Sequence, residues 1–122
     1  MDSNELKNIS SKVSFEEWFA CDETEGNITY YFTCDDMEFA RKFFKDDDYE
    51  EEILGFTVSV DVSLPLVENE YPSIEISPFV KDCNGYSDID WRDIVLPDDE
   101  AYELAAIGAK HYKADMERRA EV

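Results

Sequence analysis

Apolar and polar residues alternate most regularly in the middle of the chain. From position 56 to 64, an apolar side chain occupies every second position, and Thr, Ser or Asp stands between them. Successive side chains of a β-strand point to opposite faces, so this alternation predicts a strand with one covered and one exposed face. A further strand is predicted over 74–79, where Pro78 indicates a sheet edge or a bulge because proline has no backbone N–H to donate.

Two strands are predicted before this region, joined as a hairpin. Residues 12–21 alternate in polarity except at Glu17, and residues 28–34 are rich in aromatic and β-branched side chains. The polar stretch 24–27 between them contains a glycine and is typical of a turn. Further along the chain, a last short strand is expected around 91–95.

Helical spacing of apolar residues predicts two helices. A short one covers residues 37–44, and the carboxylates of Asp35 and Asp36 stand where a helix N-terminus is capped. The second begins after Pro97, with three acidic residues near its positive end and two arginines, at 118–119, near its negative end.

These elements follow the order strand, strand, helix, two or three strands, helix. That order predicts an α+β fold, in which an antiparallel sheet of four to five strands carries both helices on one face. A chain of 122 residues has the size of one domain. We therefore expect a single acidic domain over 1–122, of which about 1–11 is a candidate for disorder.

The cysteines are expected to be free thiols. Cys21, Cys34 and Cys83 are an odd number and form no CxxC pair, which argues against a disulfide framework and a structural zinc site. A hairpin loop centred on Gly26 and Asn27 would pair Cys21 with a phenylalanine at 32 and Cys34 with one at 19, on the core side. We therefore predict that Cys21 and Cys34 are both buried.

The net charge decides which partners the surface favours. With 31 acidic against 11 basic residues the formal charge is −20, so nucleic acid and anionic membranes would be repelled. A basic protein surface is favoured instead. No apolar stretch reaches the roughly 20 residues of a membrane-spanning helix, and the N-terminal residues lack the apolar core of a secretion signal, so a cytoplasmic location is expected.

Catalytic groups are scarce. His111 is the single histidine, and no nucleophile stands at a motif spacing from it. Motifs for phosphate, dinucleotide or zinc binding do not occur, so we predict no enzyme activity, no catalytic residue and no cofactor. Oxygen ligands gather in the stretch 82–90, but their spacing departs from an EF-hand loop and the closing glutamate is missing, so no metal site is predicted.

An acidic run between the first helix and the central strand is the strongest candidate for binding a partner. Such runs are usually solvated helix ends, but here acids also crowd several other segments. One of these segments contains a tryptophan, and aromatic side chains commonly anchor interfaces. The predicted partner-binding residues are Asp46, Asp47, Asp48, Tyr49, Glu50, Glu51, Glu52, Asp88, Asp90 and Trp91.

The sequence favours a non-enzymatic acidic protein that docks on a basic surface of a partner protein. Its carboxylates would occupy the places of nucleic-acid phosphates and so inhibit a DNA- or RNA-binding protein or a nuclease. Small anti-CRISPR and anti-restriction inhibitors, and immunity proteins of nuclease toxins, resemble this chain in size and charge. Two alternatives stay open. One is a structural or accessory domain, as a homodimer through a sheet edge or exposed aromatic residues, whose acidity serves solubility; the other, less favoured, is a carboxylate-based, metal-dependent enzyme.

Overall fold

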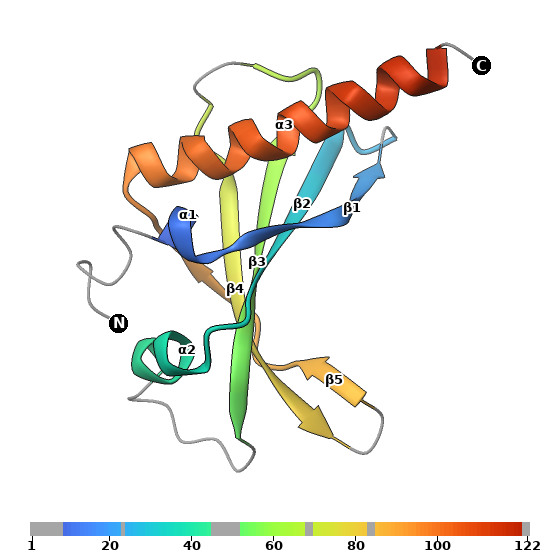
Figure 1. Ribbon diagram of the computed structural model, residues 1–122. Helices are drawn as coiled ribbons and strands as arrows, with labels where there is room; N and C mark the ends of the chain where they lie inside the picture. Colours follow the sequence, from blue (N-terminus) through green and yellow to red (C-terminus); the bar gives the residue numbers. More distant parts are fainter. Residues whose placement is uncertain (1–8, 23, 45–51, 68–69, 83–84, 121–122) are drawn as a thin grey trace.

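The computed structural model describes residues 9–22, 24–44, 52–67, 70–82 and 85–120. Within these ranges an antiparallel sheet lies against two helices, and a short helical turn precedes the first strand (Figure 1). The elements are, in chain order, α1 (Ile9–Lys12), β1 (Ser14–Asp22), β2 (Asn27–Cys34), α2 (Met37–Phe43), β3 (Ile53–Ser63), β4 (Ser73–Asp82), β5 (Gly85–Asp88), β6 (Arg92–Ile94) and α3 (Asp98–Ala120).

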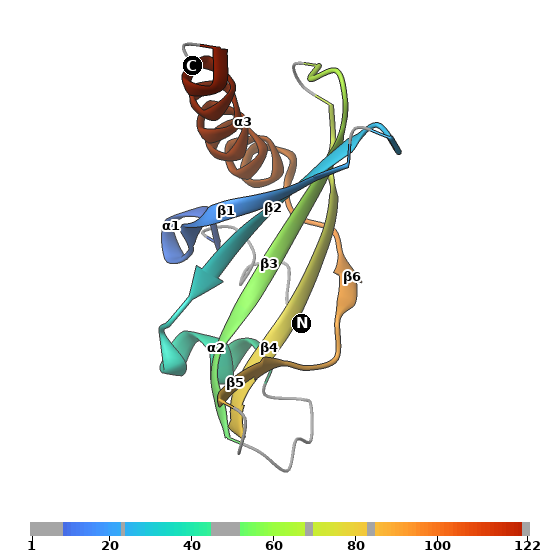
Figure 2. The ribbon, with the colours of Figure 1, turned by 90° about the vertical axis from the view of Figure 1, so that its right-hand side faces the viewer.

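The sheet has six strands in the described part of the chain, in the order β1-β2-β3-β4-β5, and β6 also pairs with β4. β5 pairs with residues 79–82 of β4 and β6 with residues 74–76, so the two short strands share the outer edge of β4. The predicted α+β fold is confirmed, with both longer helices on one face (Figure 2). The sheet exceeds the four to five predicted strands because the outer edge of β4 carries β5, which was not predicted, in addition to β6, which lies where the last strand was expected.

Pro78 lies within β4 although this strand is paired on both sides. It stands opposite Phe56 of β3, and on its other side its carbonyl accepts a hydrogen bond of 2.9 Å from the N–H of Ile89. The nitrogen and the carbonyl of one strand residue point to the same side. The missing N–H therefore faces the gap between β5 and β6, and the β3–β4 ladder loses no hydrogen bond.

The alternation along β3 separates a core face from an open face. Phe56, Val58 and Val60 are fully buried, whereas Thr57 and Ser59 on the other side are half-buried. Register pairing places the buried residues of β2 and β4 on the same face as those of β3. α2 and α3 both cover this core face, and no helix of the described ranges lies on the open face (Figure 2).

α2 is capped and packed as its sequence indicates. The backbone N–H of Phe39 donates to Oδ1 of Asp36 at 3.1 Å, so Asp36 is the N-cap residue. The rings of Phe43 and Phe44 pack against the ring of Phe56, with centroid distances of 5.6 and 6.1 Å. This aromatic cluster fixes α2 on the lower end of the core face in Figure 1.

α3 crosses the other end of the core face and approaches it closely at Gly108. A Cβ added to Gly108 would stand 2.2 Å from carbons of the Tyr30 ring, so the helix can approach this closely only because the residue is glycine. The ring of Tyr30 is fully buried, and this burial is the largest of the causes that raise its pKa to about 12.

The first turn of α3 is joined to α1. The buried carboxylate of Glu100 accepts a hydrogen bond of 3.0 Å from the backbone N–H of Ser10. Ile9, the first residue of α1, is fully buried in the core. Ile9 and this hydrogen bond tie the start of α1 to the core, and residues 1–8 of the segment expected to be disordered lie outside the described residues.

The β1–β2 hairpin has a different register from the predicted one. Cys21 pairs with Ile28 and not with Phe32, because β1 and β2 meet at the pair Asp22 and Asn27. The register difference is an even number of residues, so Cys21 keeps its face of the sheet. It is nevertheless exposed, since it lies one residue from the end of β1, and the prediction of burial is wrong for this thiol.

Cys34 is buried, as predicted, but with a different neighbour. It pairs in register with Phe56 of β3 and not with Phe19 of β1, which stands opposite Tyr30. No part of the side chain is exposed, and burial raises the pKa of the Cys34 thiol. Both effects lower the reactivity of Cys34, because the reacting species is an accessible thiolate.

We expect the thiols of Cys21 and Cys34 to differ in alkylation rate by at least about a hundredfold. Cys21 is accessible in the folded protein, whereas Cys34 reacts only after the core opens, at a cost of several kcal/mol. Site-resolved mass spectrometry after pulses of iodoacetamide at pH 8 measures both rates. Equal rates in the native state would contradict the structure, and equal rates in 6 M guanidinium chloride provide the control.

Candidate functional site

The open face of the sheet carries threonine–carboxylate hydrogen bonds. Each threonine hydroxyl donates to a carboxylate on another strand of the sheet, which fixes the direction of the carboxylate. An ionised carboxylate has about four acceptor positions, so each keeps capacity for a further donor. The pairs are Thr29 with Asp61 at 2.7 Å, Thr57 with Asp88 at 2.7 Å, and Thr33 with Glu16.

Two of these pairs lie in a groove at the β5 end of the sheet, with a volume of about 560 Å³, here called the acidic groove. β1, β2, β3, β4 and β5 contribute to its walls, together with the first residue of α2 and the residue that follows β2. Its lining residues are Glu16, Thr33, Asp35, Met37, Leu54, Thr57, Phe79, Tyr86 and Asp88.

The acidic groove combines negative charge with accessible apolar surface. Tyr86 is 71% exposed, and its ring meets Phe79 edge-to-face at a centroid distance of 6.1 Å. Met37 is 38% exposed. None of the described residues that line the groove is basic, and the exposed Lys81 is paired with Tyr86 just beyond the lining. An ammonium or guanidinium group would thus meet carboxylates beside an aromatic ring, which attracts cations through its face.

The structure brings one of the predicted binding residues into this groove. Asp88 ends β5 and lines the groove, held by Thr57. Asp90 accepts a hydrogen bond from Arg92 at 2.6 Å, so a positive charge already stands beside it. Trp91 is 40% exposed and precedes β6 on the outer edge of β4. Asp90 and Trp91 follow Asp88 in the chain but are outside the groove lining.

The acidic run after α2 is described only at its last residue. Glu52 forms an ion pair with Arg41 of α2, whose Nε also donates to the carbonyl of Ile53 at 3.1 Å. The charge of Glu52 is therefore locally compensated. The other predicted residues of this run, Asp46, Asp47, Asp48, Tyr49, Glu50 and Glu51, lie outside the described residues.

Other chemistry is limited in the described ranges. There, no group of three or more His, Cys, Asp or Glu side chains is placed to hold a metal ion, and of the oxygen-rich stretch 82–90 the residues 83 and 84 are not described. The exposed ring of His111 stacks on Phe15 at a centroid distance of 4.1 Å, which gives it a packing role. No helix in the described part of the chain is long and apolar enough to cross a membrane.

Comparison with protein-family models, with curated proteins and with solved structures finds no match to this chain. Its function is therefore argued from the geometry of the chain itself.

Several groove residues were not predicted as binding residues from the sequence. The alternation along β1 already placed Glu16 on the open side, and that signal was available. No local pattern indicated that Glu16 and Asp35 would meet Asp88, which comes from a strand more than fifty positions further along the chain. Their proximity depends on the order of strands in the sheet.

Proposed function

We propose that this protein is a non-enzymatic binding protein whose acidic groove docks on a basic surface of a partner protein. The observation that carries the proposal is the groove itself, where Glu16, Asp35 and Asp88 surround accessible apolar side chains. Interfaces of this kind use charge to steer association and aromatic residues to anchor it. The formal charge of −20 extends the attraction to a basic partner beyond the groove.

The partner class that fits best is a protein that normally binds nucleic acid. Such proteins place Lys and Arg side chains to meet phosphates at regular intervals. The threonine-held carboxylates of Asp61, Asp88 and Glu16 present oriented negative groups on one sheet face, which such Lys and Arg side chains could meet. We therefore propose that the protein competes with DNA or RNA for a cytoplasmic nucleic-acid-binding protein or nuclease.

The test compares a groove variant with a charge-matched control. The groove variant carries Glu16→Gln, Asp35→Asn and Asp88→Asn; the control neutralises three exposed acids outside both grooves, Glu25, Asp93 and Asp98. Wild type and both variants are immobilised, incubated with cell lysate at 50 and 500 mM NaCl, and the retained proteins are identified. Each retained protein is then purified, and its affinity for the three versions is measured by titration calorimetry.

We expect wild type and control to retain the same basic proteins at low salt, and the groove variant to bind them about ten- to a hundredfold more weakly. Added duplex DNA or single-stranded RNA should displace them. Equal affinity for groove variant and control would contradict docking through the groove. Binding that nucleic acid does not displace would reject mimicry while leaving the docking proposal standing. Circular dichroism confirms that each variant is folded.

A further inference from the structure

The outer face of α3 carries an ordered stripe of charges. Asp99, Glu103, Ala106, Lys110 and Lys113 follow one another at alternating steps of four and three residues, and all are exposed. At 3.6 residues per turn, this spacing keeps one face of a helix in line. The buried residues of α3 lie on the opposite face, which packs on the sheet: Glu100, Ala101, Leu104 and Gly108.

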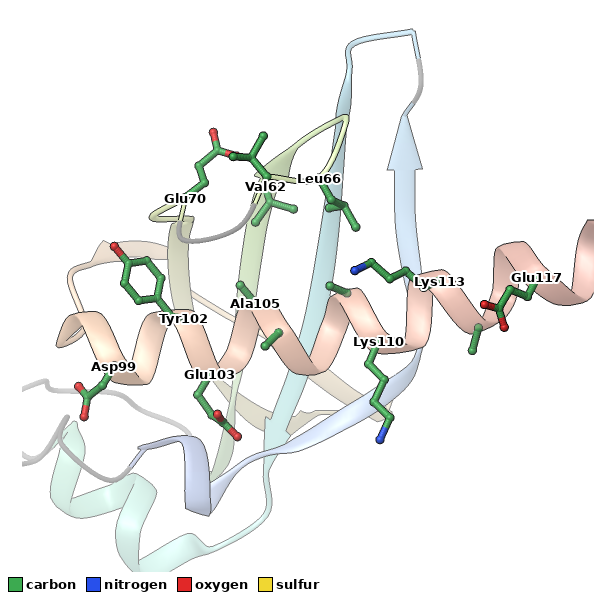
Figure 3. A pocket seen from close by; sticks show the side chains of 14 residues that line it. Val62, Leu66, Glu70, Asp99, Tyr102, Glu103, Ala105, Lys110, Lys113 and Glu117 are labelled. Carbon is green, nitrogen blue, oxygen red and sulfur yellow. The ribbon is translucent and has the colours of Figure 1, made fainter.

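A groove of about 840 Å³ runs along this helix, between α3 and the segment that follows β3 (Figure 3). Its apolar lining comes from both walls. On one side are Val62, Leu66 and Val67, the last of which is 65% exposed. On the helix side, Tyr102 and several alanines line it, so a second helix could approach closely at this face.

The charges along α3 identify what would fill this groove. Acidic residues occupy its N-terminal half at Asp99 and Glu103, and lysines follow at Lys110 and Lys113; Glu117, the next residue of the stripe, has no counterpart in a twofold arrangement about Ala106, because position 95 precedes α3. A helix of complementary charge must carry lysines opposite the acids and acids opposite the lysines. α3 itself, turned end for end, has this order. We propose that the groove and outer face of α3 receive a second copy of this chain, with the two α3 helices antiparallel about a twofold axis at Ala106.

The helical rise shows that the charges come into register. The rise of a helix is about 1.5 Å per residue, so Glu103 lies roughly 4.5 Å along the helix from the twofold axis at Ala106. Lys110 of the second copy lies roughly 6 Å from the twofold axis in the same direction. Asp99 and Lys113 of the second copy are both about 10.5 Å away. Each acid therefore faces a lysine, and symmetry repeats both pairs. Ala106, with the smallest side chain of the stripe, stands where the helices cross.

The sheet edges do not offer a comparable contact. The register of β1 shifts between Phe15 and Phe19, and the edge beyond β4 is divided between two short strands. Irregular or short edges oppose pairing with another sheet.

The overall charge makes this dimer sensitive to salt. Two chains of −20 repel one another at long range, whereas the Glu103–Lys110 and Asp99–Lys113 pairs attract at contact. At about 0.15 M salt the screening length is about 8 Å, so the long-range repulsion is reduced far more than the contact pairs. A contact built on one helix and one loop is small, and small interfaces are weak and transient. We expect dimers at protein concentrations of about 10 to 500 μM.

Charge reversal tests this arrangement. Sedimentation equilibrium at 150 mM NaCl, over that concentration range, measures the dimer dissociation constant of wild type, Glu103→Lys, Lys110→Glu and the double variant. In a twofold dimer, either single charge reversal replaces two attractive contacts between the copies by two like-charge contacts. The double variant carries both reversals in each chain and so restores both attractive contacts. We expect Glu103→Lys to weaken the dimer by about tenfold or more, and the double variant to recover most of the loss.

The Glu103→Lys result separates this interface from non-specific association. The substitution makes the chain two charges less negative, so relief of overall repulsion alone would strengthen the dimer. A wild type that stays monomeric up to 500 μM, a stronger dimer in Glu103→Lys, or no recovery in the double variant would each overturn the proposal. Binding of a heterologous helix to a wild-type chain that stays monomeric would show that another protein occupies the groove. Circular dichroism checks that each variant is folded. If Glu103→Lys is unstable, the comparison of Lys110→Glu with the double variant still tests the proposal.

Discussion

Phe56→Ala is expected to lower the free energy of unfolding by about 3 to 5 kcal/mol. The side chain is fully buried and contacts three other rings, Phe39, Phe43 and Phe44, at centroid distances of 5.6 to 6.1 Å. Its removal takes away apolar burial and leaves a cavity where α2 meets β3. Small domains have a total stability of about 5 to 15 kcal/mol, so this variant will be largely unfolded at moderate urea concentrations.

Urea denaturation followed by circular dichroism measures this change. Val95→Ala is the matched control, because Val95 is 77% exposed and its truncation should change stability by less than about 0.5 kcal/mol. A loss below about 1 kcal/mol for Phe56→Ala would mean that the aromatic cluster does not hold α2 on the sheet.

Gly108→Ala is expected to destabilise the protein by about 1 to 3 kcal/mol, although the same change in an isolated helix would stabilise it by about 1 kcal/mol. Contact of α3 with the sheet reverses the sign of this change in stability. The added Cβ would stand 2.2 Å from ring carbons of Tyr30, a ring that is itself fully buried and cannot move aside freely. α3 would have to shift away from the core face.

A double variant separates this steric effect from other causes. In a Tyr30→Leu background the ring is absent, so adding Gly108→Ala should cost much less than it does in the wild type, as urea denaturation of the four proteins would show. An equal cost in both backgrounds would place the strain elsewhere. A Gly108→Ala protein more stable than the wild type would contradict the close approach of α3.

The two proposed binding surfaces lie on opposite sides of the sheet. The acidic groove is lined by open-face residues such as Thr57 and Asp88, whereas α3 lies over the core face on the other side of the sheet (Figure 2). A dimer formed through α3 would leave both acidic grooves accessible to a partner. Because the two surfaces share no residue, each proposal can fail without affecting the other.

Several elements could be predicted because their signals are local. The alternation in β3 correctly separated buried from open positions, since the period of a strand is set by the backbone alone. The cap at Asp36 was recognisable because a capping side chain binds a backbone N–H three residues away. The acidic start of α3 was equally visible in the chain.

Other features depended on how the elements meet. Cys21 and Cys34 have similar local patterns, yet one is exposed and one is buried, because Cys34 pairs with the central strand and Cys21 lies near a hairpin loop. The last strand, predicted around 91–95, is β6, and the unpredicted β5 precedes it because one edge of β4 accommodates both on either side of Pro78. Neither outcome follows from the residues nearest in sequence.

The sequence by itself determined the α+β class, most of the strands and helices, and the large negative charge. These depend on composition and on patterns within about one element. Only the tertiary structure decided that Glu16, Asp35 and Asp88 line one groove, whereas Glu52 is paired with Arg41. Charge is a property of the chain, but an electrostatic site needs several charges within a few ångströms, and those distances are set by strand order, register and helix packing.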